Sequence, residues 1–280
     1  MVMKQIRMLL STAMTLAMML PTALRAQDNA THENAVDALW RHATEAYADK
    51  RFTEAAETFT RISDMGYGSA ELYYNLGNAY FKAGQSDIGA NGRPFASGEL
   101  GRAVLNYRRA LKIDPSMSDA QYNLDLAVDY TNDTEGIPEF VMSRVWRSLR
   151  DMLSSNAWAA ISIAALAVML ALATMYLLSR NIAMRKAGFY GALLLALLFI
   201  VTTLLAASQR SVELRDDMAV VVCRDTAPVH SSPDSETKVI REPSQGVTVT
   251  VGRTLGGWSE ITFADGEKGW IRTADIEIIR

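Results

Sequence analysis

The amino-acid sequence predicts a multidomain membrane protein that combines an α-helical repeat array, two transmembrane helices and a C-terminal all-β barrel. Apolar residues recur at helical spacing between residues 35 and 130, which favours packed helices. Two later stretches of roughly twenty residues carry no charge and match the thickness of a bilayer. Near the C-terminus, apolar and polar residues alternate from Val247 to Val251, which is typical of a strand. The length of 280 residues allows about two folded domains, and the net charge of −3 gives no reason to expect a nucleic-acid partner.

Residues 1–26 have the pattern of a secretory signal peptide. Lys4 and Arg7 precede an apolar run, and the segment ends in small residues at Ala26. Leu24 is larger than the residue preferred near a cleavage point, and an uncleaved anchor is the alternative. Under either interpretation we expect the following segment to be exported.

Residues 27–130 are expected to form the repeat array, and the run from Glu71 to Gly84 is its clearest unit. One helical stripe carries three large residues and one small one, namely Tyr73, Leu76, Gly77 and Tyr80. The small Gly77 allows a neighbouring helix to approach, and we expect Gly84 to end the helix. The run resembles the first helix of a tetratricopeptide (TPR) repeat. This resemblance implies surfaces that hold peptides rather than catalytic groups.

Two weaker units flank this one. A helical hairpin is expected over residues 35–64, and a half-unit begins at Ser118. The middle unit is interrupted, because its second helix starts only near Gly98. We therefore expect an inserted loop at residues 85–97, which is longer than a normal turn. The loop is either a tolerated surface insertion or a specificity element at the mouth of a groove.

The resemblance to TPR arrays implies that the first helix of each unit lines an inner groove. Five residues are the candidates for partner contacts there: Arg41, Glu45, Tyr74, Asn78 and Tyr122. Asn and Tyr side chains can bond the backbone of an extended peptide. The set lacks the several lysines expected for gripping a C-terminal carboxylate. For each of these residues, plain solvent exposure is the alternative.

A linker and a short amphipathic helix are expected over residues 131–156. Between Phe140 and Leu153, one helical face is apolar and the opposite face carries three arginines. The apolar residues are Val141, Val145, Leu149 and Met152, and the arginines are Arg144, Arg147 and Arg150. This pattern is typical of a helix that lies along lipid headgroups. A water-exposed helix is the alternative.

Transmembrane helices are predicted at residues 157–178 and 187–207, joined by a turn at residues 179–186. The turn holds three cations and no acidic residue, namely Arg180, Arg185 and Lys186, which favours a cytoplasmic position. The arginines before the first span weaken this argument. Export of the segment after the signal peptide decides the matter, and we predict that both folded parts lie outside the cytoplasm.

Residues 218–280 are predicted to form short strands separated by turns marked by Gly and Pro. The run from Gly246 and the Gly-Trp pairs at Trp258 and Trp270 resemble the bacterial SH3-like domain. The resemblance implies a small barrel that binds cell-wall peptides or acts as an adaptor. The two tryptophans belong either to its core or to its rim, where they would form a binding surface. The single cysteine, Cys223, is expected to be buried in a strand, with an intermolecular or redox-sensing thiol as the alternative.

No set of residues indicates catalysis, so we expect neither enzymatic activity nor a bound metal or cofactor. The three histidines, His32, His42 and His230, lack metal-ligand spacing. The Gly-rich segment near residue 90 lacks the Gly-Lys-Ser/Thr ending of a phosphate loop. Ser235-Glu-Thr-Lys238 fits a nucleophile motif by chance, because it lies in an expected barrel loop without companion motifs.

The order of these parts resembles the BatE family of the bacterial aerotolerance (Bat) operon. The family implies a protein of the bacterial inner (cytoplasmic) membrane with its TPR and SH3-like parts in the periplasm. It also implies protein partners, namely sister Bat membrane proteins with von Willebrand A domains and, indirectly, a MoxR-type ATPase. A non-enzymatic scaffold in an envelope stress complex follows from this resemblance. The alternative function is a sensor or adaptor that reads peptidoglycan through the SH3-like domain.

Overall fold

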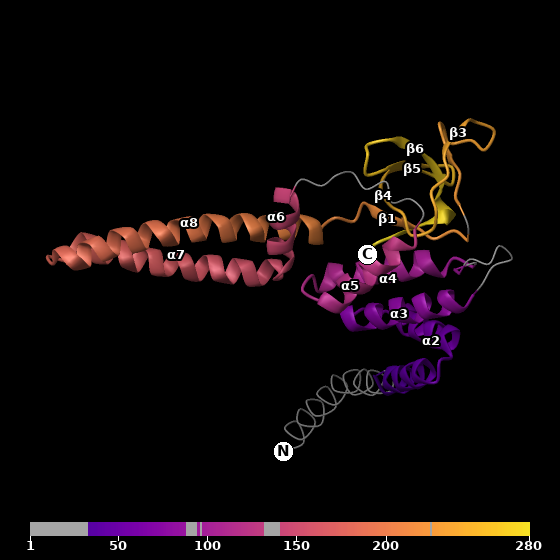
Figure 1. Ribbon diagram of the computed structural model, residues 1–280, viewed down its shortest axis with the longest axis horizontal. Coiled ribbons are helices and arrows are strands. Elements are labelled where there is room, and N and C mark those ends of the chain that lie inside the picture. The colour runs from indigo at the N-terminus through magenta and orange to yellow at the C-terminus, as the bar shows by residue number, and fades with distance from the viewer. Residues whose placement is uncertain (1–32, 88–93, 96, 132–140, 225) are drawn as a thin grey trace, which may run out of the picture. The chain divides into compact units, whose positions relative to one another are not determined.

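The computed structural model describes residues 33–87, 94–95, 97–131, 141–224 and 226–280 (Figure 1). The predicted signal peptide lies outside the described residues, as do much of the predicted inserted loop and much of the predicted linker. The chain divides into two compact units, residues 1–67 and residues 68–280.

The first unit is a helical hairpin. A helix over residues 33–48 is followed by α2, Phe52–Asp64, and the turn between them places Lys50 at a φ of 65°. Alanines on both helices are buried, namely Ala43, Ala46, Ala55 and Ala56. The rings of Trp40 and Phe59 meet edge to face with centroids 5.4 Å apart. These helices confirm the hairpin predicted over residues 35–64.

The second unit opens with three packed helices: α3, Ala70–Ser86; α4, Glu99–Ile113; and α5, Ser118–Asp129. The Ser69 hydroxyl caps α3 by accepting a hydrogen bond from the backbone N–H of Leu72 at 3.1 Å. Gly98 precedes α4 at a φ of 91°, a left-handed conformation that favours glycine. The starts of α4 and α5 agree with the predicted positions.

The prediction that Gly84 ends its helix was wrong. The helix α3 continues to Ser86, and Gly84 lies inside it. A Cβ atom on Gly84 would lie 2.2 Å from the ring of Phe95. Gly84 is therefore a point of close packing for Phe95 rather than a C-terminal cap. The role predicted for Gly77 holds, because a Cβ atom there would lie 2.7 Å from the Tyr107 ring on α4.

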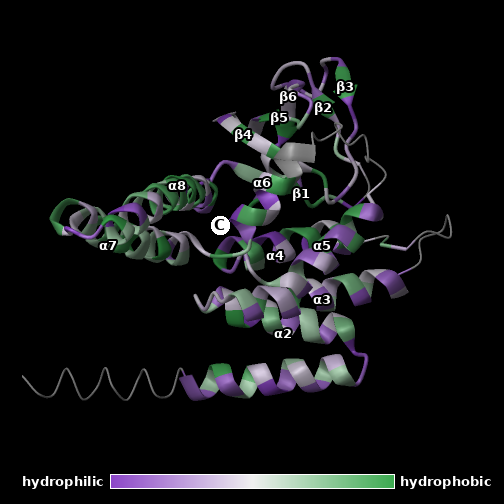
Figure 2. Ribbon diagram, turned by 60° about the vertical axis from the view of Figure 1, so that its left-hand side comes forward, coloured by the Kyte–Doolittle hydropathy of each residue, from purple (hydrophilic) through white to green (hydrophobic). Residues whose placement is uncertain are grey.

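A short helix and a long apolar hairpin follow: α6, Val141–Asp151; α7, Ser155–Leu178; and α8, Ile182–Glu213. Figure 2 shows hydrophobic residues along both long helices. By length and composition, both can cross a membrane. Each contains the predicted span and extends beyond it. The turn is shorter than predicted, because residues 182–186 already belong to α8.

Seven strands form one antiparallel sheet in the order β3-β2-β6-β5-β4-β1-β7. The strands are β1, Met218–Val221; β2, Val229–His230; β3, Val239–Arg241; β4, Thr248–Leu255; β5, Trp258–Thr262; β6, Lys268–Arg272; and β7, Ile276–Ile278, with the 3-10 helix η1, Thr273–Asp275, before β7. The alternating pattern at Val247–Val251 predicts β4, in which Val249 is buried and the last four residues are exposed.

Two apolar clusters hold the second unit together. One lies within the sheet and includes Val229, Ile261 and Ile271. The other joins α3, α4 and α5 to the sheet, because it contains Val220 of β1 and Ile279 beside helical residues such as Tyr107. The helices and the sheet thus share one core.

Candidate binding surfaces

The predicted groove residues on α3 take part in a hydrogen-bond network among three helices. The Tyr107 hydroxyl on α4 donates to Oδ1 of Asn78 at 2.8 Å, and Nδ2 of Asn123 on α5 donates to the same oxygen at 2.8 Å. Nδ2 of Asn123 also lies 3.5 Å from the hydroxyl of Tyr74. Because Tyr107 is buried, the carboxamide oxygen of Asn78 holds the helices together instead of facing a partner.

Tyr122 differs from these residues because its side chain is 70% exposed. Two more exposed side chains follow Tyr122 at four-residue intervals. Leu126 lies on α5, and Tyr130 lies directly after the end of that helix. Tyr122 is therefore the accessible member of the predicted set on the second unit. Asn123, which was not predicted, is the residue that links Tyr74 to Asn78. The stretches Tyr74-Asn75-Leu76 and Tyr122-Asn123-Leu124 have the same sequence. In this alignment Asn123 corresponds to Asn75 and not to Asn78, so the repeat does not predict the contact between Asn123 and Asn78.

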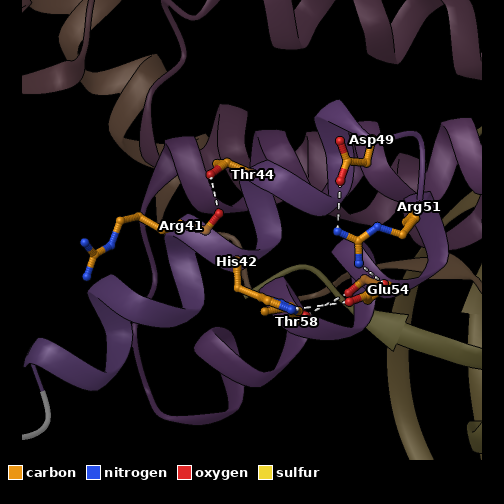
Figure 3. Close-up of polar contacts among 7 residues, drawn as sticks. All are labelled: Arg41, His42, Thr44, Asp49, Arg51, Glu54 and Thr58. Atoms are coloured by element: carbon orange, nitrogen blue, oxygen red, sulfur yellow. Dashed lines mark hydrogen bonds and ion pairs between the residues drawn. The ribbon is translucent and has the colours of Figure 1, made fainter.

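The remaining predicted groove residues, Arg41 and Glu45, lie on the helix of the first unit and are exposed. Figure 3 shows the Arg41 side chain pointing away from the other polar side chains drawn. Its Nε donates to the backbone carbonyl oxygen of Asp37 at 3.3 Å. The structure thus leaves the side chains of Arg41 and Glu45 accessible.

A polar cluster at the turn of the first hairpin was not predicted. Arg51 bonds both Asp49, at 3.1 Å, and Glu54, and His42 Nε2 lies 3.3 Å from Glu54 (Figure 3). The hydrogen bond to Glu54, followed by the one to Asp49, raises the pKa of Arg51 above its ordinary value. The cluster joins the two helices across their turn. Such exposed pairs stabilise a fold only weakly.

A second candidate surface lies on the face of the sheet opposite its apolar core. The register pairs Trp258 with Arg272, Glu260 with Trp270, and His230 with Trp270. Because paired residues project to the same side of a sheet, these side chains gather on one face. We name this group, together with Arg253, the Trp258 cluster: His230, Arg253, Trp258, Glu260, Trp270 and Arg272.

Ring contacts and charges order the Trp258 cluster. The His230 and Trp258 rings meet edge to face at 5.2 Å, and the Arg272 guanidinium lies 5.8 Å from the Trp258 ring centroid. Arg253 lies 5.4 Å from the Trp270 ring centroid, and its Nε is 3.1 Å from Oε2 of Glu260. These distances place both arginines within reach of cation–π attraction.

The structure distinguishes the two tryptophans. Trp270 is 7% exposed, with Arg253 over its ring, whereas Trp258 is half-buried beside the exposed Arg272. His230 is 5% exposed, and its Nδ1 lies 3.0 Å from the backbone oxygen of Thr237. A ligand can therefore reach Trp258 and Arg272 but little of Trp270. An aromatic face beside a guanidinium suits peptide or carbohydrate groups that carry carboxylates.

Most of this sheet matches a known domain family. Residues 224–277 match the family model of the bacterial SH3 domain. The matched segment runs from before β2 into β7 and contains the whole Trp258 cluster, whereas β1 precedes it. The SH3 domain indicates binding of protein or peptidoglycan, and such domains typically lie outside the cytoplasm. No curated protein matches the chain.

The SH3 domain is docked on α4 by polar contacts that surround the shared core. Arg109 bonds Glu277 at 2.8 Å and the carbonyl oxygen of Ile278 at 3.2 Å. Lys112 Nζ donates to the carbonyl oxygens of Arg215 and Ile279, at 2.7 and 2.9 Å, and to Asp216 at 2.7 Å. One lysine thus ties α4 to the chain just after α8 and to the C-terminal end of the sheet.

The end of the inserted loop is also built into this interface. Phe95 is 3% exposed and packs against Phe81 and Tyr130, with ring centroids 5.4 and 5.3 Å apart. Its backbone adopts a φ of 65°, which is uncommon for a residue other than glycine. The described end of the insertion is therefore part of the core. The two predicted alternatives for the loop, a surface insertion and a specificity element, stay predictions.

Two further predictions for the described residues concern metal ligands and Cys223. In the described part of the chain, no three His, Cys, Asp or Glu side chains are grouped as metal ligands. Cys223 lies just after β1 instead of within a strand, is half-buried, and packs against the cluster inside the sheet. The alternative, an intermolecular or redox-sensing thiol, is not tested.

Proposed function

We propose that this chain is a non-enzymatic scaffold that holds protein partners beside a bacterial inner membrane. The observation that carries the proposal is the core shared by α3–α5 and the SH3 domain. Because Val220 and Ile279 pack among the helices, two surfaces suited to binding belong to one packed body. Lys112 ties that body to the end of α8, which is apolar enough to span the bilayer.

The arrangement of the partners follows from the resemblance to the BatE family. In this proposal α7 and α8 cross the inner membrane, and the TPR-like helices and SH3 domain lie in the periplasm. The exported position agrees with the usual location of bacterial SH3 domains. The partners are sister Bat membrane proteins with von Willebrand A domains, and a MoxR-type ATPase acts through them. The complex supports aerotolerance or envelope stress resistance.

A crosslinking experiment on membranes tests the scaffold. The full chain and a Tyr122→Ala, Leu126→Ala variant are crosslinked in cells and purified, and the captured proteins are identified. Both side chains are exposed on α5, so the variant keeps the fold. We expect it to lose a crosslinked membrane protein that carries a von Willebrand A domain.

The control variant is Ile113→Ala, which removes a half-exposed apolar side chain at the end of α4. It should keep the crosslink. Equal capture by all three proteins would count against binding through this helical surface. Deletion of residues 27–130 is a poor test, because it would also uncover Val220 and Ile279.

A second function, peptidoglycan binding, is favoured by the Trp258 cluster. Half-buried Trp258 and exposed Arg272 offer an aromatic face beside a cation, which suits the sugar rings and carboxylates of the cell wall. The test is sedimentation of the detergent-purified full chain with isolated peptidoglycan. Retention should fall with Trp258→Ala and with Arg272→Ala. Lys268→Ala removes an exposed cation from the same strand and should leave retention unchanged. If none of the proteins sediments, this function is excluded.

A further inference from the structure

A cavity of about 320 Å³ lies where α7 ends and α8 begins. Its lining combines aromatic, apolar and cationic side chains: Tyr176, Ile182, Arg185, Lys186, Phe189 and Tyr190. The Phe189 ring contacts two other lining rings. Its centroid lies 5.7 Å from that of Tyr176 on α7 and 5.4 Å from that of Tyr190, the next residue on α8. The Arg185 guanidinium lies 5.4 Å from the Tyr176 ring centroid. The cavity is therefore lined by side chains from both helices.

Close packing of the two helices fixes the walls of this cavity. Gly188 lies between the lining residues of α8, and a Cβ atom there would be 2.8 Å from the carbonyl oxygen of Leu172 and 3.0 Å from the backbone nitrogen of Tyr176. The start of α8 is capped by Asn181, whose side-chain oxygen accepts a hydrogen bond from the N–H of Ala183 at 2.9 Å. Arg185 and Lys186 thus project from the start of α8, close to the point where Gly188 packs against α7.

The positive charge of this cavity has no acidic counterpart in the hairpin. The sequence contains no Asp or Glu between Ala157 and Val212, whereas Arg185 and Lys186 both line the cavity. Glu213, the next acidic residue, lies at the opposite end of α8. A site with two cations and no internal carboxylate favours an anionic ligand.

We propose that this cavity binds the phosphate-bearing headgroup of an anionic phospholipid. The hairpin is apolar along its length, so in a bilayer its basic turn lies at the depth of the lipid phosphates. A guanidinium binds phosphate through paired hydrogen bonds, and tyrosine rings suit the boundary between headgroups and acyl chains. Basic pockets between transmembrane helices are suited to anionic headgroups, and the volume is within the range of small-ligand sites. The proposal goes beyond the scaffold function and requires only that α7 and α8 span the membrane.

Native mass spectrometry of the full chain in detergent tests this site. Phosphatidylglycerol and phosphatidylcholine are titrated in parallel, and the lipid-bound fraction is measured. We expect phosphatidylglycerol to be retained preferentially. Arg185→Gln should weaken its binding by about tenfold, the effect of losing one charge-assisted hydrogen-bonding group. Tyr176→Leu should also weaken binding, because it removes the ring beneath Arg185.

The matched control is Arg180→Gln. It removes the same charge from the turn just before α8, but Arg180 does not line the cavity. Equal weakening by Arg180→Gln and Arg185→Gln would show attraction to net charge and overturn the proposal, as would equal retention of the two lipids. Inorganic phosphate at millimolar concentration should not displace the lipid. Displacement by phosphate alone would assign the site to the free ion instead. Loss of this site would leave crosslinking through Tyr122 unaffected, so the two proposals fail separately.

Discussion

Gln245 of the SH3 domain donates a hydrogen bond from its Nε2 to the backbone carbonyl oxygen of Phe95, across 2.6 Å and 150 positions of sequence. Its Oε1 accepts from the N–H of Gly101 at 3.4 Å. A single buried carboxamide thus serves the end of the inserted loop and the first turn of α4. The interface between the helices and the sheet therefore contains directional hydrogen bonds as well as apolar contacts.

Replacement of Gln245 by alanine should destabilise the protein. Both Phe95 and Gly101 would lose a buried hydrogen-bond partner, which costs roughly 1–3 kcal/mol in the free energy of unfolding. Chemical unfolding of the detergent-purified chain measures the loss. Gln121→Ala on the exposed side of α5 is the control and should change little. An unchanged unfolding midpoint for Gln245→Ala would show that the interface tolerates the missing carboxamide.

Gly101→Ala should separate α4 from β1. A Cβ atom at this position would lie 2.5 Å from the carbonyl oxygen of Val221 and 3.0 Å from the Cα atom of Val222, and backbone atoms cannot rotate away. Such overpacking costs roughly 1–3 kcal/mol. The same unfolding experiment applies. Gly252→Ala is the control, because its nearest neighbour would be the Glu260 side chain at 3.4 Å. Equal stability of the two variants would contradict the close approach of helix and strand.

The sequence predicts the elements of this fold well because their signals are local. Helical spacing identifies α3 and α5, continuous apolarity identifies α7 and α8, and alternation identifies β4. The position of Gly84 was misjudged because its function depends on Phe95, which returns from the inserted loop. A glycine that ends a helix and one that admits a neighbouring ring look the same in sequence.

The candidate surfaces could be predicted only in part, because contacts from sequence-distant residues decide which side chains are accessible. The sequence places Tyr74, Asn78 and Tyr122 on first helices, but contacts with Tyr107 and Asn123 from other helices decide which of them stay accessible. Trp258 and Trp270 carry the same Gly-Trp signature in the sequence. Trp270 lies opposite both His230 of β2 and Glu260 of β5, and this strand register is not a local property.

The two tryptophans should respond differently to truncation. Trp270→Ala removes a ring that is only 7% exposed and should cost roughly 3–5 kcal/mol in the free energy of unfolding. Trp258→Ala should cost clearly less, because its side chain is already half-exposed to solvent. Unfolding curves of both variants in detergent measure the difference. A larger loss for Trp258→Ala would contradict the finding that Trp270 is the more buried of the two tryptophans.

The contact between Lys112 and Asp216 should give stability a specific pH dependence. The hydrogen bond from Lys112, followed by its positive charge, lowers the pKa of Asp216 below its ordinary value of 3.8. A carboxyl group whose pKa is lower in the folded state contributes stability that is present above its unfolded pKa and lost as the pH falls through the folded pKa. Asp216→Asn should therefore lower the melting temperature slightly at pH 7.

The difference between Asp216→Asn and the natural protein should shrink as the pH falls below 3.8 and vanish below the folded pKa. It should also shrink with added salt, because Asp216 is exposed. Glu242→Gln, another exposed carboxyl change, serves as the control. A difference that grows toward acidic pH would reverse the sign of this argument.

The orientation of the membrane hairpin is open to a direct test. Arg180, Arg185 and Lys186 favour a cytoplasmic turn, and two spanning helices then return the SH3 domain to the exported side. Alkaline phosphatase, which folds only after export, should be active when fused through a linker to the exposed Arg280. A fusion truncated at Asn181, between the two helices, should be inactive. Activity only in the second fusion would place the SH3 domain in the cytoplasm, out of reach of peptidoglycan, and would leave the headgroup cavity on the periplasmic side of the bilayer.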